Sequence, residues 1–109
     1  MPYDRTMVIT RPDDTRPFFF EVHPEFGTIA RSDLANLGVL SIVTISDNGL
    51  EFSASHPCDT IEELTKYKEY FTTTPYLNLM IEYCNSVGHT FTWTYDSVET
   101  ETIWNNISV

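Results

Sequence analysis

Apolar and polar residues alternate on both sides of Asn48-Gly49, and the pattern predicts a β-hairpin. Asn-Gly is the preferred pair for a two-residue type I′ turn, in which both central residues adopt positive φ. With this pair as the loop, Ile45 lies opposite Phe52 and the apolar side chains of both arms share one face. That face consists of Val43, Ile45, Leu50, Phe52 and Ala54. A shift of one residue would place Thr44 opposite Phe52 and expose Ile45, so the turn and the alternation predict the same register.

A helix is predicted before the hairpin. Residues 24–37 carry apolar side chains at helical offsets, and Gly38 stands where a glycine commonly ends a helix. Gly27 weakens the first turn, so we expect the regular part to begin near Thr28.

A second helix is predicted over residues 59–71. Its start has two candidate capping boxes, Asp59 with Glu62 and Thr60 with Glu63. In either case the early carboxylates suit the positive end of the helix dipole.

A third helix is predicted over residues 75–87. Thr74 fits its N-cap, Pro75 its first position and Gly88 its end. The apolar segment 76–83 also fits a buried strand, and this alternative stays open at the level of sequence.

Strands are predicted near both ends of the chain. Residues 5–10 form a short apolar run, and the prolines and aspartates of 11–17 form a loop. Residues 18–22 are interpreted as a strand buried on both faces. Residues 89–96 alternate aromatic residues with threonines, a composition typical of strands, and 98–104 return as an edge strand marked by glutamates.

The three consecutive phenylalanines, Phe18, Phe19 and Phe20, allow two interpretations. Most such runs pack in a core. The alternative is an aromatic docking patch for a partner chain.

This order of elements predicts an α+β fold with a ferredoxin-like β-α-β-β-α-β core. We expect a mostly antiparallel sheet with helices on one face and an extra strand at each end. The single domain then divides into an N-terminal strand and loop (1–16), the core (17–96) and a C-terminal edge strand and tail (97–109). The other sheet face would be uncovered. If it carries Leu40, Ile42 and one row of the strand over 18–22, a second copy of the same sheet is its simplest cover, which predicts a homodimer or a larger assembly.

Charge is the strongest bias of composition. The chain has six Lys plus Arg against sixteen Asp plus Glu, a formal net charge of −10. Direct binding to nucleic acid through phosphate neutralisation is therefore not expected. The acidic surface either keeps the protein soluble or occupies a basic, DNA-binding groove on another protein.

The sequence predicts neither a membrane protein nor a disulfide scaffold. The first 22 residues lack the basic flank and apolar segment of a signal peptide, and no apolar stretch approaches the length of a membrane span. With only Cys58 and Cys84, we expect a protein of a reducing compartment that needs no disulfide.

Candidate chemistry centres on two histidines and two thiols. His56-x-Cys58 and Cys84-x4-His89 offer the ligand types that zinc prefers, but neither has the spacing typical of zinc sites. A cysteine nucleophile would need a histidine beside it and an orienting group. No glycine-rich phosphate loop is present in the sequence. We expect no catalytic residue, metal or cofactor.

Two resemblances extend this interpretation. The succession DNGLEFSASHPCDTIEELTKYKEYF, then TPYLNLMIEYCNSVGHTFTW, resembles the second half of small dimeric α+β barrels of the antibiotic-biosynthesis-monooxygenase type. The opening MVITRPDDTRPFFF, followed by the same succession, is similar to short uncharacterised proteins encoded among structural genes of T4-like tailed bacteriophages. The resemblance implies a fold and a setting, a phage particle or a phage-encoded accessory in the virion or the host cytoplasm, and no catalytic residue.

Three classes of function follow. The first is a non-enzymatic structural or assembly protein that contacts itself and other virion proteins, a class that a large apolar face would favour. The second is an acidic inhibitor that mimics DNA, which needs carboxylates clustered on one surface. The third is a small monooxygenase-like enzyme with a cavity lined by His89, Trp93 or Tyr83. For the first class, the expected contact residues are Phe18, Phe19, Phe20, Leu40, Ile42, Trp93, Tyr95 and Trp104.

Overall fold

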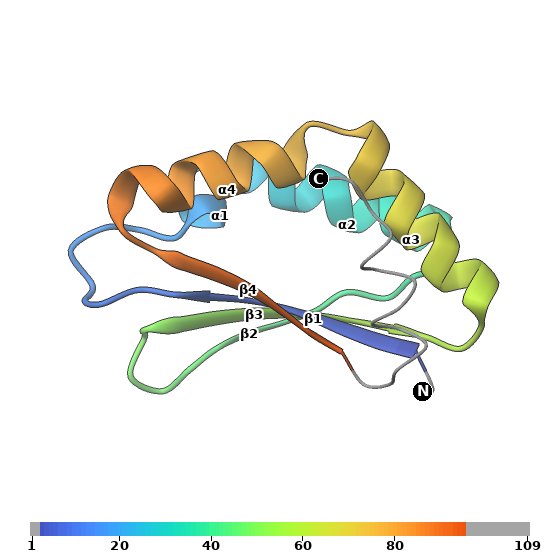
Figure 1. The fold of residues 1–109 in the computed structure, drawn as a ribbon, viewed down its shortest axis with the longest axis horizontal. Helices are drawn as coiled ribbons and strands as arrows, with labels where there is room; N and C mark the ends of the chain where they lie inside the picture. Colours follow the sequence, from blue (N-terminus) through green and yellow to red (C-terminus); the bar gives the residue numbers. More distant parts are fainter. Residues whose placement is uncertain (1–2, 96–109) are drawn as a thin grey trace.

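The computed structural model describes residues 3–95 of the 109-residue chain and shows one antiparallel sheet with helices on one of its faces (Figure 1). In chain order the elements are β1 (Tyr3–Thr10), α1 (Phe19–Val22), α2 (Pro24–Asn36), β2 (Ile42–Ile45), β3 (Glu51–Cys58), α3 (Ile61–Thr73), α4 (Tyr76–Val87) and β4 (Thr90–Tyr95). The strands lie in the order β2-β3-β1-β4. This is the α+β fold with the predicted ferredoxin-like order.

The first strand of that core is not the one that the sequence predicted. β1 lies in the middle of the sheet, paired with β3 on one side and β4 on the other, so the run 5–10 is a central strand and not an extra one. Its inward side chains are Arg5, Met7 and Ile9, all buried. An arginine at a core position hides the alternation that would have marked this strand in the sequence.

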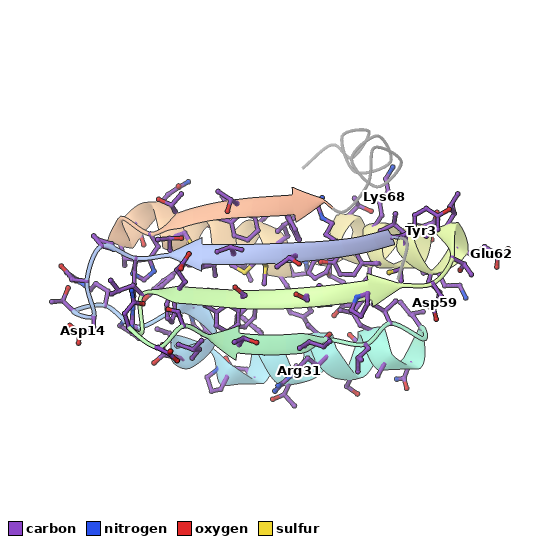
Figure 2. The ribbon with its side chains drawn as sticks, turned by 90° about the horizontal axis from the view of Figure 1, so that it is seen from below. Tyr3, Asp14, Arg31, Asp59, Glu62 and Lys68 are labelled. Atoms are coloured by element: carbon purple, nitrogen blue, oxygen red, sulfur yellow. The ribbon has the colours of Figure 1, made fainter. Side chains whose placement is uncertain are left out.

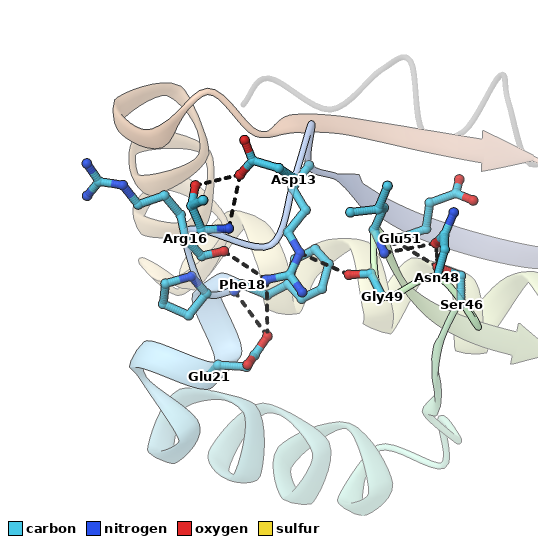
Figure 3. A network of polar contacts seen from close by, with 12 residues as sticks. Asp13, Arg16, Phe18, Glu21, Ser46, Asn48, Gly49 and Glu51 are labelled. Carbon is cyan, nitrogen blue, oxygen red and sulfur yellow. Dashed lines mark hydrogen bonds and ion pairs between the residues drawn. The ribbon is translucent and has the colours of Figure 1, made fainter.

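The predicted strand over 18–22 is wrong, because this segment forms the short helix α1. A brief apolar run fits either element, and here polar contacts decide the outcome. The Glu21 carboxylate accepts from the Phe18 backbone N–H at 3.2 Å, and the Glu21 N–H donates to the Phe18 carbonyl at 2.9 Å. Arg11 lies over the Phe18 ring, with its guanidinium carbon 4.1 Å from the ring centroid (Figure 3).

The hairpin register is confirmed, but the predicted turn type is wrong. Ile45 lies opposite Phe52, and the Ser46 N–H donates to the Glu51 carbonyl at 2.9 Å. Of the two residues predicted for the turn, Gly49 adopts positive φ, at 73°, and Asn48 does not, whereas a type I′ turn requires positive φ of both. The Asn48 side chain instead accepts hydrogen bonds from the Leu50 N–H and the Ser46 hydroxyl, which closes a wider loop (Figure 3). The pattern of side chains therefore fixed the register although the loop is longer.

The helix termini follow the predicted capping residues in part. The Thr60 hydroxyl accepts from the Glu63 N–H at 3.2 Å and caps α3. Gly38 and Gly88 follow α2 and α4 with φ of 85° and 76°, as expected for glycines that end helices. α2 begins at Pro24 and not near Thr28, because proline suits the first helical position and offsets the weakness of Gly27.

The segment 76–83 is helical, so the strand alternative is wrong. Thr74 does not cap α4 at its N-terminus: its hydroxyl donates to the Tyr70 carbonyl at 2.9 Å and closes α3. The predicted edge strand 98–104 and the tail after it lie outside the described residues.

The core lies between the sheet and the helices. It combines inward strand residues with the inner stripes of the helices, and Phe18, Leu34, Leu64, Tyr67 and Leu77 are almost completely buried in it. β1 supplies its centre, and α3 and α4 cover the side of the sheet toward β4, while α2 lies along the β2 side (Figure 2). In this arrangement the helices do not cover the outer edge of β2 or the second face of the sheet, so both are candidate functional surfaces.

Candidate functional site

The β2 edge is the most apolar exposed part of the described chain. We define it by Leu40, Ile42, Val43 and Ile45, whose exposed fractions are 60%, 49%, 43% and 51%. Val43 and Ile45 have the predicted inward register, but they remain exposed because β2 is the outermost strand and α2 does not cover them fully. No charged residue lies between Val39 and Ser46. Natural edge strands usually carry charge or proline, so an uncharged apolar edge is unusual.

Backbone groups of this edge also face outward. The hydrogen bond between the Ser46 N–H and the Glu51 carbonyl fixes which residues of β2 bond to β3. Bonded and non-bonded pairs alternate in an antiparallel ladder, so the N–H and C=O groups of Val43 and Ile45 point away from β3. Within residues 3–95, β2 has β3 as its one neighbour in the sheet. The edge therefore presents a row of donors and acceptors to which another strand could pair.

The uncovered sheet face differs from the apolar face that the sequence predicted. Most of its positions, with Val8 of β1 as an exception, are hydroxyl residues that run across the described strands. They are Thr6, Thr10, Thr44, Ser53, Ser55, Thr90 and Thr92. Thr6 and Ser55 hydrogen-bond to each other across β1 and β3 at 3.1 Å. The expectation of an apolar face was wrong because the face consists of the residues between the buried ones, and most of those residues, apart from Val8 and Ile42, are polar. Ile42, at the β2 margin of this face, is exposed.

Most of the predicted contact residues do not lie on this surface. Phe18 and Phe19 are buried in the core, so the docking-patch interpretation is wrong for both. Phe20 is half-buried and packs against Phe52, with ring centroids 5.4 Å apart. Trp93 is half-buried on the inner face of the sheet.

Two predicted contact residues lie toward the C-terminus. Tyr95 pairs with Arg5 through the β1–β4 ladder, and Trp104 lies outside the described residues. Among the predicted contact residues whose burial the structure describes, Leu40 and Ile42 are freely exposed, and both belong to the β2 edge.

A cavity of about 180 Å³ lies between α2 and the sheet, beside β2. We call it the α2 cavity. Four aromatic residues, Phe20, Phe52, Phe71 and Tyr76, contribute to its wall. Gly27 makes the close approach of α2 possible, because a Cβ atom there would come within 3.1 Å of the Phe20 ring. The cavity that the sequence analysis associated with an enzyme would be lined by His89, Trp93 or Tyr83, and none of these lines it.

One wall of the α2 cavity is polar. His56 and Ser41 line it, and the Ser41 hydroxyl lies 3.2 Å from His56 Nδ1. Burial lowers the pKa of His56 to about 4; a hydrogen bond with the Leu40 backbone acts in the opposite direction, and the Arg5 cation lowers the pKa further. The imidazole is therefore neutral at neutral pH.

Behind His56 lies a group of buried aromatic and polar residues that the sequence analysis missed. The His56 ring lies 4.6 Å from that of Tyr67, measured between centroids. Arg5 is completely buried, and its guanidinium carbon lies 3.7 Å from the centroid of the Trp93 ring. A cation on an aromatic face is a favourable contact in a low-dielectric interior. The sequence signal was partial: Arg5, Met7 and Ile9 alternate with Thr6 and Val8, of which only Thr6 is polar, and an arginine is rarely assigned to a core.

The cysteines and histidines do not meet in one site. Cys58 and Cys84 are free and buried, and burial raises the pKa of the Cys84 thiol. The Cys58 thiol donates to the His56 carbonyl at 3.6 Å, and the His89 ring lies against Phe18 and Tyr83. In the part of the chain that the structure describes, no three His, Cys, Asp or Glu residues form a group that could hold a metal ion.

The described carboxylates concentrate on the helices and turns. All four helices carry at least one acidic residue, whereas the β2 edge carries none. The acidic residues of the helices are Glu21, Glu25, Asp33, Glu62, Glu63, Glu69 and Glu82. The negative charge thus lies mainly away from the open edge.

Comparisons of the chain with protein family models, with curated proteins and with solved structures returned no match. Among residues 3–95, no helix has the length and apolar character needed to cross a membrane.

Proposed function

We propose that the protein is a non-enzymatic assembly protein that binds a second copy of itself through the β2 edge. The observation that supports the proposal is the combination of exposed apolar side chains and outward backbone groups on one short strand. Strand addition satisfies those backbone groups, and the apolar side chains on both faces of the strand would be buried at the same time.

A two-fold axis through the edge gives the simplest geometry. Antiparallel pairing of β2 with its copy would extend two sheets of four strands into one continuous sheet. Each chain would then present the same self-complementary surface, which closes the assembly as a dimer. The distribution of charge supports this arrangement, because no acidic residue lies on β2.

The net charge of −10 on each chain opposes association. Added salt screens this repulsion, whereas it leaves a contact made by apolar groups intact. We therefore expect dimerisation to strengthen as ionic strength rises, in contrast to an interface that depends on ion pairs.

The test measures mass in solution for the full chain over about 1–100 µM, a range that covers micromolar dissociation constants. We expect the wild-type chain to approach twice its 12.6 kDa mass as concentration rises. Ile45→Pro removes an outward N–H without breaking a β2–β3 bond, so the variant should remain a monomer. Ile42→Thr should weaken association.

Ile61→Thr is the matched control. Ile61 is 47% exposed against 49% for Ile42, but it lies on α3, away from the edge. The control should dimerise like the wild-type chain. A wild-type monomer at 100 µM in high salt, or a dimer that Ile45→Pro leaves intact, would contradict the proposal.

The resemblance to phage proteins supports a virion setting for this assembly. In that setting other virion proteins are the further partners that we propose. Purified particles probed with an antibody against the chain test this part separately. Absence of the chain from particles would remove the virion setting and leave the subunit contact to be judged by mass.

A further inference from the structure

The α2 cavity has the size and lining of a small-molecule site. Its volume of about 180 Å³ is close to the ~150 Å³ of an engineered apolar cavity that binds benzene, so it can hold one six-membered ring with a small substituent. Four aromatic side chains contribute to the wall. Such rings favour an aromatic guest, because edge-to-face and offset contacts stabilise aromatic pairs beyond their buried area.

The polar wall indicates which substituent the ring would carry. Ser41 Oγ and the His56 ring are hydrogen-bonded to each other at 3.2 Å and are the polar pair on the sheet side of the cavity. A hydroxyl can accept and donate at the same time, so Ser41 can bond to a ligand while it keeps its contact with His56. Neither group is charged at neutral pH, and a neutral ligand therefore suits this wall better than an ion.

The opening of the α2 cavity is formed by residues of a single chain. Arg31 on α2 lines the cavity, and Figure 2 shows it beyond the β2 side of the sheet. Its Nε donates to the Gly27 carbonyl at 3.3 Å, which holds the side chain along the helix. Val43 of β2 lines the opposite part of the rim and is 43% exposed. A ligand can thus enter between α2 and β2 without opening the core.

We propose that the α2 cavity binds a neutral aromatic molecule of one ring with a hydroxyl group, of the phenol class, with the ring among the aromatic side chains and the hydroxyl bonded to Ser41. The site goes beyond the proposed subunit contact. Its lining residues come from one chain, but Val43 also belongs to the β2 edge, so the binding test includes Ile45→Pro, the variant expected to remain a monomer.

The first test compares three probes of equal heavy-atom count by calorimetric titration of the full chain at neutral pH. Phenol has the ring and the hydroxyl, toluene lacks the hydroxyl, and cyclohexanol lacks the aromatic ring. We expect saturable one-to-one binding of phenol, with toluene and cyclohexanol each about five- to tenfold weaker, the factor that one hydrogen bond or one aromatic contact supplies. Benzoate should bind more weakly than phenol, because a carboxylate at the wall formed by Ser41 and His56 would be buried beside uncharged groups, while the Arg31 cation lies at the outer rim.

The second test uses variants that change the cavity and not the fold. Val43→Phe places a larger side chain at the rim and should weaken phenol binding at least tenfold. Ile45→Phe is its matched control, because Ile45 lies two residues along the same face of β2 but does not line the cavity. Ser41→Ala should lower phenol affinity to that of toluene and leave toluene unchanged.

Three results would overturn the proposal. The first is no saturable binding of phenol up to about 10 mM, well beyond the affinity of a weak fragment. The second is equal affinity for phenol in Val43→Phe and Ile45→Phe, which would place binding elsewhere. The third is equal loss of phenol and toluene binding in Ser41→Ala, which would mean that the hydroxyl does not bond to Ser41. A failure of the dimer test with intact phenol binding would separate this site from the proposed assembly function.

Discussion

The two sides of the sheet's helical face differ in how completely they are filled. On the side of α3, α4, β1 and β4, most rings and aliphatic side chains pack against one another, and the Tyr67 and Phe71 ring centroids are 4.9 Å apart. A few residues of this side, Met7, Phe71, Tyr76 and Met80, also contribute to the wall of the α2 cavity. On the side of α2 and β2, there is a cavity of about 180 Å³ and an exposed apolar strand. We call these the packed half and the open half.

The difference in packing shows where the fold can tolerate a change of side-chain volume. A packed half with few voids transmits any change of volume into strain, so its residues are constrained by stability. The open half has a short strand of four residues at its margin and does not bury it. Both proposals therefore concern the open half, where side chains are not already committed to the core.

The largest expected effect tests this contrast with one substitution at two places. Leu64 on α3 and Leu34 on α2 are both almost completely buried, but only Leu34 lines the α2 cavity. We expect Leu64→Ala to lower the free energy of unfolding by about 4 kcal/mol, since it creates a closed void. Leu34→Ala should cost about 2–3 kcal/mol, because rim side chains can move into the added space. Urea denaturation measures both, and equal losses would end the distinction between the halves.

A smaller effect comes from His56, which lies at the boundary of the two halves. Its pKa in the folded protein is about 4, below the ordinary 6.5, so the unfolded chain takes up the proton first as pH falls. The contribution to stability is complete above pH 6.5 and is lost as pH falls toward 4, with a total of up to about 3 kcal/mol. Unfolding free energies measured from pH 7 to 4 test this.

His56→Gln is the control for the pH dependence. Glutamine does not titrate, so the difference between wild type and variant should change across this pH range. Other groups, including His89, whose pKa burial also lowers, contribute to both proteins and cancel in the difference. If the difference in unfolding free energy between wild type and His56→Gln does not change with pH, then His56 is solvated in the folded protein and water reaches the boundary between the halves.

The smallest effect concerns the residue that joins the halves at the hairpin end. Arg11 Nε donates to the Gly49 carbonyl at 2.9 Å, and Nη1 donates to the Arg16 carbonyl at 2.8 Å (Figure 3). The guanidinium also covers Phe18. Arg11→Met keeps the apolar stem but removes these contacts, and we expect a loss of about 1–2 kcal/mol. Thermal unfolding measures the loss.

Arg16→Met is the matched control for Arg11, because the structure uses the backbone carbonyl of Arg16, not its exposed side chain. The control should unfold within about 0.5 kcal/mol of wild type, as expected for a surface substitution. Equal losses in the two variants would mean that removal of positive charge, and not the loss of the contacts of Arg11, causes the effect.

The sequence predicted those parts of the fold where local pattern and local contact agree. The pairing of Ile45 with Phe52 followed from alternation alone, because a one-residue shift would reverse every face. The Thr60 cap and the terminal glycines of α2 and α4 were also correct, since each satisfies backbone groups within a few residues.

The sequence-based prediction was wrong or incomplete where contacts with residues far along the chain determine the local structure. The helix that replaces the predicted strand is supported by Arg11, which lies over the Phe18 ring and 3.9 Å from the Glu21 carboxylate, in addition to the local bond between Glu21 and Phe18. Arg5 points inward against Trp93, which lies far along the chain. Of the candidate site, Leu40 and Ile42 were predicted from their apolar character. The α2 cavity was not, because a void arises from the spacing of α2 and β2 and leaves no mark in either segment.

The central position of β1 has a consequence for folding during synthesis of the chain. Both neighbours of β1 follow it in the chain: β3 begins at residue 51 and β4 at residue 90. A nascent chain emerging from the ribosome therefore carries an unsatisfied strand through most of its synthesis, and such strands fold slowly and attract chaperones. A chain whose synthesis stops before residue 90 lacks β4, and one side of its central strand β1 stays unpaired.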